Sequence, residues 1–316
     1  MDEQRIEAYL NLINTLLLNR ESEAEINKIL NDNRELIDSG LWQTIFLVSE
    51  QLESAGNQDH AEFLLKIASQ LASQDYTNFL MKVLRATEKS EGDSKVVYPL
   101  LQQNLDKLDN IFANTLRNWA TAKFLEVELD VAESIAIDIG NFSNLIREFP
   151  LGNKANKMEI SIAGCEVILK FFTSESHQEN WAAIQNNLGI AYSNRIRGNK
   201  AENIEFAIAA FQQALQVRTQ TDFPIDWAAT QNNLGLAYWE RIREDKAENI
   251  EFAIAAYQNA LQVYTQTDFP IDWAMTQNNL GLAYWERIRE DKAENIEFAI
   301  AAYQNALQVY TQTDFP

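Results

Sequence analysis

The chain has one thiol and one nearby imidazole that could in principle do chemistry, Cys165 and His177, twelve residues apart. A thiol and an imidazole can perform nucleophilic catalysis when the two side chains meet beside an oxyanion-binding group. Here the pair would straddle a helix end, and no oxyanion-hole motif accompanies it. Cys165 and His177 also stand where a later copy of a repeated segment has Phe211 and Phe223. We therefore predict a core thiol and a packed or helix-end histidine.

Motifs for phosphate and metal binding are also missing. The GNKA segments at Gly152 and Gly198 lack the first glycine and the Ser/Thr of a phosphate loop. His60 and His177, the only histidines, have no metal-ligand spacing. The acid-rich REDKAEN segments are typical of solvated loops. The sequence therefore predicts a protein that is not an enzyme and binds no cofactor or metal.

Composition and charge narrow the partners further. The 316 residues carry a net charge of -20 without any Lys/Arg cluster, which disfavours nucleic acid and anionic membranes as partners. The apolar stretches are too short to cross a membrane, and the acidic start MDEQRIEAYL does not resemble a signal peptide. A single cysteine excludes an internal disulfide and suits a reducing compartment. We expect a cytoplasmic protein.

A period of 46 residues organises the second half of the chain. Three copies occupy 181–226, 227–272 and 273–316, and the last two differ only at Ala229 and Met275. A fixed period of tens of residues is the signature of a supersecondary unit stacked on itself.

Each period contains two predicted helices. Apolar residues from Trp227 to Ile242 follow helical spacing, a charged loop intervenes, and a second stripe runs from Ile250 to Tyr264. Asp226 and Asn249 precede the two stripes as plausible N-caps. Gly235 has no Cβ, so the second helix can approach closely there. The period therefore predicts an all-α solenoid of helical hairpins.

A diverged copy of the repeat lies upstream of the three similar copies. GNKANKMEISIA at Gly152 aligns with GNKAENIEFAIA at Gly198. FSNLIREF at Phe142 aligns with YSNRIR at Tyr192, and four extra residues, EFPL, precede the GNK at Gly152. Residues 131–180 are therefore predicted to form a degenerate repeat. We expect one long connecting helix over 91–130 and a helical N-terminal module over 1–90.

The hairpins resemble the tetratricopeptide repeat. Its pattern, W-x2-L-G-x2-Y followed by A-x3-F, is matched by Leu234, Gly235, Tyr238, Ala253 and Tyr257, and by the same positions of the other two copies. Glutamine replaces the Trp, and the period is 46 residues instead of about 34. The lengthened period is similar to that of kinesin light chain.

A wider resemblance covers most of the chain. The stretches YPLLQQNLDKLDNIFANTLRNWATA, DIGNFSNLIREFPLGNKA and WAxxQNNLGxAY resemble the N-terminal half of cyanobacterial proteins that join such repeats to a caspase-like (CHAT) domain. The chain stops at Pro316 inside a repeat, so we expect the array to continue or to lead to a domain absent here.

In the tetratricopeptide family the first helix of each repeat lines a groove that binds extended peptides. An asparagine ladder of Asn186, Asn232 and Asn278 could bond a ligand backbone, since each amide both donates and accepts. Trp239 and Trp285 could be anchors. In the alternative, the asparagines bond one another and water, and the tryptophans pack between repeats. Matching the motif position by position gives the groove candidates Ala183, Asn186, Ile190, Ser193 and Asn194; Ala229, Asn232, Leu236, Trp239 and Glu240; and Met275, Asn278, Leu282, Trp285 and Glu286.

These features lead to a non-enzymatic scaffold that binds a protein or peptide in the groove of the array. The alternative is the sensor half of a caspase-like protease whose catalytic domain is absent from this chain. A third hypothesis is self-association through the uncapped last helix, where Ile300, Tyr303, Leu307 and Tyr310 are expected to be partly exposed.

Overall fold

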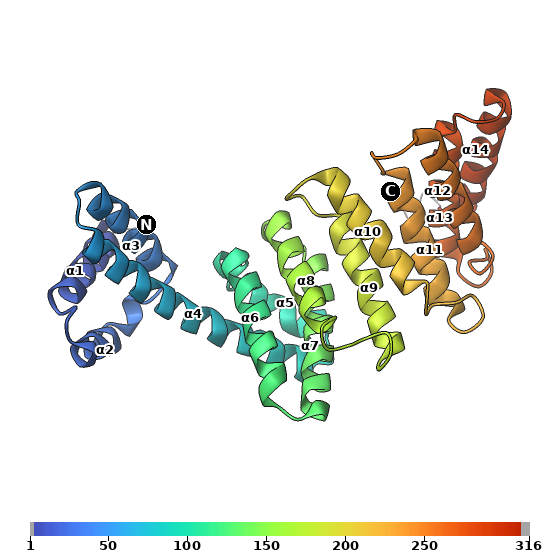
Figure 1. The fold of residues 1–316 in the computed structure, drawn as a ribbon. Helices are drawn as coiled ribbons and strands as arrows, with labels where there is room; N and C mark the ends of the chain where they lie inside the picture. Colours follow the sequence, from blue (N-terminus) through green and yellow to red (C-terminus); the bar gives the residue numbers. More distant parts are fainter. Residues whose placement is uncertain (1–2, 311–316) are drawn as a thin grey trace. The chain divides into compact units, whose positions relative to one another are not determined.

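The computed structural model describes residues 3–310, and every regular element in this range is a helix (Figure 1). The chain divides into two compact units, residues 1–85 and 86–316. The predicted all-α class and the predicted solenoid of stacked hairpins are confirmed.

The first unit is built from four helices. A short 3-10 turn, Arg34–Leu36, follows the second of them, and the last crosses into the second unit. Tyr9 donates a hydrogen bond to Asp38 Oδ1 at 2.6 Å, and the same oxygen accepts the backbone N–H of Gly40 at 2.9 Å. The carboxylate therefore joins the first helix to the start of the third. The bounds are α1 Glu3–Leu18, α2 Glu23–Asp32, α3 Ser39–Ser54 and α4 Gln58–Lys89.

The expected single helix over 91–130 is wrong. The structure has α5 Ser94–Gln102, a 3-10 turn Leu105–Lys107 and α6 Asn110–Glu126. Two aspartates explain the interruption: Asp93 and Asp109 each accept a backbone N–H of the helix that follows, at 2.9 and 3.0 Å. A side chain that caps a new helix favours a break in the backbone immediately before it.

Four hairpins follow in the second unit, each made of a helix A and then a helix B (Figure 1). Each helix A packs against helix B of its own hairpin, and from α9 onward also against helix B of the preceding hairpin. The helices A are α7 Leu129–Glu148, α9 Gln178–Ser193, α11 Pro224–Trp239 and α13 Pro270–Glu286. The helices B are α8 Lys154–Ile168, α10 Lys200–Ala214, α12 Lys246–Ala260 and α14 Lys292–Leu307.

Two predicted caps are wrong. Helix α11 begins at Pro224, whose fixed φ suits the first helical position, so Asp226 lies inside the first turn. Helix α12 is capped by Asp245, which accepts the N–H of Glu248 at 2.9 Å. Asn249 is instead buried in that helix and donates to the carbonyl of Arg243 at 2.8 Å. It fastens the loop to the helix.

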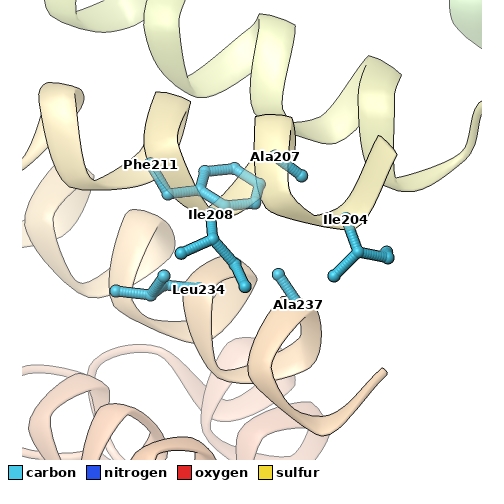
Figure 2. Packing of buried hydrophobic residues seen from close by; sticks show 6 residues of the cluster. All are labelled: Ile204, Ala207, Ile208, Phe211, Leu234 and Ala237. Carbon is cyan, nitrogen blue, oxygen red and sulfur yellow. The ribbon is translucent and has the colours of Figure 1, made fainter. Parts of the chain in front are cut away.

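The core joins consecutive hairpins. Figure 2 shows Ile204, Ile208 and Phe211 of α10 facing Leu234 and Ala237 of α11, all at most 7% exposed. An equivalent cluster joins α12 to α13, because the residues 46 positions later are of the same types. One hairpin therefore completes its core only with the next, as expected for a repeat array.

Candidate binding face of the helical array

The asparagines of the predicted ladder do not share one environment. Asn186 and Asn232 are buried at 8% and 6% exposure, whereas Asn278 is exposed. The Oδ1 atom of Asn186 accepts from Asn233 at 3.2 Å, and that of Asn232 accepts from Asn279 at 3.3 Å. These bonds connect each helix A to the next one. Asn186 and Asn232 therefore have a packing role. Their partners, Asn233 and Asn279, are the second asparagines of the NN pairs and were not among the predicted residues.

The two predicted tryptophan anchors also differ. Trp239 is half-buried and packs against the cluster of Ile250 and Leu280, with Lys246 Nζ 5.6 Å from its ring centroid. Trp285 is 61% exposed. Trp239 therefore packs between repeats, as in the alternative in which the tryptophans do not bind a ligand. Ligand binding by Trp239 or Trp285 stays a prediction.

The glutamates among the groove candidates form ion pairs between repeats. Lys200 reaches Glu240 at 2.6 Å, and Lys246 reaches Glu286 at 3.2 Å. Lys200 also donates to the carbonyl of Ser193 at 3.0 Å, at the end of helix A in its own repeat. The carboxylates of Glu240 and Glu286 therefore connect neighbouring repeats. Asn194, the equivalent residue at the end of α9, is exposed.

A second set of charged contacts reinforces each junction. Arg241 donates through Nε and Nη2 to the two carboxylate oxygens of Glu205, in the preceding repeat, at 2.8 and 2.7 Å. Arg287 and Glu251 repeat this bidentate geometry at 2.8 Å for both bonds. The paired guanidinium lowers the pKa of each glutamate. Such pairing is geometrically specific and fixes the register of one repeat on the next.

The remaining groove candidates form a partly exposed row, which we call the apolar row. Leu236 is 38% and Met275 41% exposed, and the other members are half-buried. Within each helix A the two members are seven residues apart, so they lie on the same face. The members are Ala183 and Ile190 of α9, Ala229 and Leu236 of α11, and Met275 and Leu282 of α13.

An open hollow of 140 Å³ adjoins this row between α7 and α9. Ala183 belongs to both the row and the hollow. The sequence reasoning missed the hollow because it carried the groove positions over only to the three repeats of 181–316. The full lining is Ala136, Ile137, Gly140, Asn141, Asn144, Ile168, Phe172, Asn180, Ala183, Ile184 and Asn187.

Cys165 and His177 occupy the environments predicted for them. The thiol is 2% exposed, and burial raises its pKa to about 12, so it remains protonated at neutral pH. The imidazole of His177 packs against the rings of Phe171 and Phe172, at centroid distances of 5.9 and 4.9 Å. The buried, protonated thiol is not accessible to a substrate.

The last helix exposes the residues predicted to be partly bare. Ile300 and Leu307 are 42% and 65% exposed, and Tyr303 and Tyr310 are half-buried. Self-association through this surface stays a prediction.

Two further features concern membrane and metal binding. No helix within residues 3–310 is long and apolar enough to cross a membrane. In the same range, no three His, Cys, Asp or Glu side chains gather as a metal site would require.

Comparisons with known proteins identify no family. No model of a protein family matches the sequence, and no curated protein does. Among solved structures, BtubC (BKLC) from P. vanneervenii is similar with a TM-score of 0.45 and 17% identity, over 78% of this chain and 93% of that chain.

Proposed function

We propose that the chain is a non-enzymatic scaffold that binds a protein or an extended peptide along the helix A face of its repeat array, in the cytoplasm. The observation that carries the proposal is the apolar row, which recurs once per repeat and stays partly exposed, with Leu236 at 38% and Met275 at 41%. Repeated apolar side chains on one face offer area that a long partner can bury.

The apolar row is a better candidate than the asparagine ladder for physical reasons. The amides of Asn186 and Asn232 and the carboxylates of Glu240 and Glu286 already have partners inside the array. A ligand that used the same atoms would compete with those contacts. Members of the apolar row are partly exposed beforehand, so a partner can cover them without dismantling a repeat junction.

The proposal is tested by charging the apolar row on the full chain. A variant carrying Leu236→Glu and Leu282→Glu, immobilised in a lysate of the source cells, is expected to retain its specific partners about tenfold less, since a buried unpaired carboxylate is strongly unfavourable. The matched control carries Ile242→Glu and Ile288→Glu, which are 65% and 64% exposed in the loops of the same repeats. The control should retain the partners. Equal retention by both variants would overturn the proposal.

The alternative function is the sensor half of a caspase-like protease, and it rests on the sequence stretches that resemble CHAT-associated proteins. Its test is the reading frame and the neighbouring genes. A domain with a catalytic His and Cys, activated when the array binds its partner, would support this alternative. A complete frame without such a domain, and no protease gene beside it, would contradict it.

A further inference from the structure

The hollow between α7 and α9 exists because the degenerate repeat carries smaller side chains than the complete ones. Aligning FSN at Phe142 with YSN at Tyr192 places Gly140 where α9 has Ile190, and Ala136 where α9 has Asn186. The later repeats carry leucine at the Gly140 position. The space that an isoleucine or leucine side chain fills elsewhere along the array is therefore open here.

The floor of the hollow is apolar and well packed. Ala136, Ile168, Phe172 and Ile184 line it, and each is at most 7% exposed. A volume of 140 Å³ is of the same order as that of an enclosed apolar cavity of about 150 Å³ that binds benzene, but this hollow is open on one side. The space therefore suits one branched aliphatic or small aromatic side chain.

The more exposed part of the lining, which we call the rim, carries uncharged amides and one apolar side chain. Asn141, Asn144, Asn180 and Asn187 are half-buried, and Ile137 is 45% exposed. The Oδ1 atom of Asn144 is buried, and no donor from the described part of the chain bonds to it. Because that oxygen is buried, the half-buried amide groups of the rim are the ones available to a peptide backbone.

We propose that this hollow is the anchor site of the scaffold and takes one aliphatic side chain of an extended peptide, whose backbone bonds to the amides of the rim. The inference rests on the proposed function and specifies its ligand. No lining residue is charged, so the site offers no partner to an acidic or basic anchor residue. The amides of the rim can both donate to and accept from a peptide backbone.

The probe is N-acetyl-leucine N-methylamide, which carries one aliphatic side chain between two backbone N–H groups. It is titrated into the ¹⁵N-labelled full-length chain, and the side-chain amide signal of Asn144 is assigned by its loss in Asn144→Leu. The alanine analogue of the probe should bind about tenfold more weakly or worse, because it buries several fewer carbon atoms. Equal affinities for the two probes would overturn the assignment, and this comparison uses the unaltered chain.

A pair of substitutions at one position then locates the binding. A Cβ on Gly140 would lie 3.5 Å from Ile168 Cδ1, an ordinary contact, so Gly140→Ala leaves the hollow open. Gly140→Leu would fill it and should weaken the leucine probe about tenfold or more. Equal binding to the two variants would exclude the hollow. The charged apolar-row variant, Leu236→Glu with Leu282→Glu, should still bind the probe, so failure of the anchor site and failure of the proposed function are told apart.

Discussion

The ring of Tyr257 occupies the space into which a Cβ atom on Gly235 would project. Such an atom would lie 2.7 Å from Cε1 and 2.8 Å from Cδ1 of the tyrosine, well inside van der Waals contact. The same relationship joins Gly189 to Phe211, at 2.6 Å. The two helices of a hairpin therefore approach each other closely because one has no side chain where the other has an aromatic ring.

Gly235→Ala is expected to destabilise the array by up to about 2 kcal/mol. Overpacking a core costs about 1–3 kcal/mol, and the gain in helix propensity returns about 1 kcal/mol of it. The measurement is the urea midpoint followed by circular dichroism. Gly140→Ala is the control, because its Cβ meets only Ile168, at 3.5 Å. An unchanged or raised midpoint for Gly235→Ala would show that the Tyr257 ring moves aside freely.

The hairpin architecture could be predicted because it depends on periodic burial. Near-identical copies put Ile204 and Ile250, or Leu234 and Leu280, in equivalent places, and the structure buries all four. Helix ends were less predictable, because the same residue type has different roles. Asp93 and Asp109 each cap a helix, whereas Asp226 lies inside the first turn of one, after the proline that begins it. The choice between these roles is made by neighbours that a pattern of apolar residues does not report.

The candidate site was only partly predictable for a related reason. Family resemblance gives the face of a helix, so it identified Leu236 and Met275, which remain partly exposed. It does not say which polar side chains on that face find partners in the next repeat, as Asn232 and Glu240 do. Such pairings depend on the rotation between repeats, which no single period encodes.

The bidentate contact between Arg241 and Glu205 should contribute more to stability than a looser pair beside it. Glu205→Gln is expected to cost about 1 kcal/mol at pH 7, because it removes a charge-assisted contact at a half-buried junction. Glu202→Gln is the control, since Glu202 and Arg243 are 3.6 Å apart and about half exposed. The guanidinium lowers the pKa of Glu205, so its contribution is complete above the usual glutamate pKa and is lost as the pH falls through the lowered value. Urea midpoints of chain and variant should therefore converge in acid, and a constant difference would contradict the ion pair.

Asp138 should make the second unit less stable as the pH rises from about 4 to about 6. Burial raises the pKa of its carboxyl from 3.8 to about 6, and the nearby charge of Glu88 adds to the effect. The folded chain therefore holds this proton more tightly than the unfolded chain, and the resulting stabilisation is lost as the pH passes through the raised pKa. Asp138→Asn should remove this fall and raise the thermal midpoint at pH 7. Glu88→Gln should remove only part of it. Parallel pH profiles for the chain and Asp138→Asn would refute the assignment.

Asn232 and Asn278 test whether the asparagines pack or bind, because they are equivalent in sequence and differ in environment. Asn232→Ala removes the acceptor of the bond from Asn279 and should cost about 1 kcal/mol. Asn278→Ala changes an exposed side chain and should change the free energy of unfolding, measured with urea, by less than about 0.5 kcal/mol. If the apolar row binds the partner, the double variant should retain the same proteins from the lysate as the unaltered chain. Loss of those proteins with both substitutions, in a chain that still folds, would instead return the asparagine ladder to the binding site, with Asn278 as its accessible member.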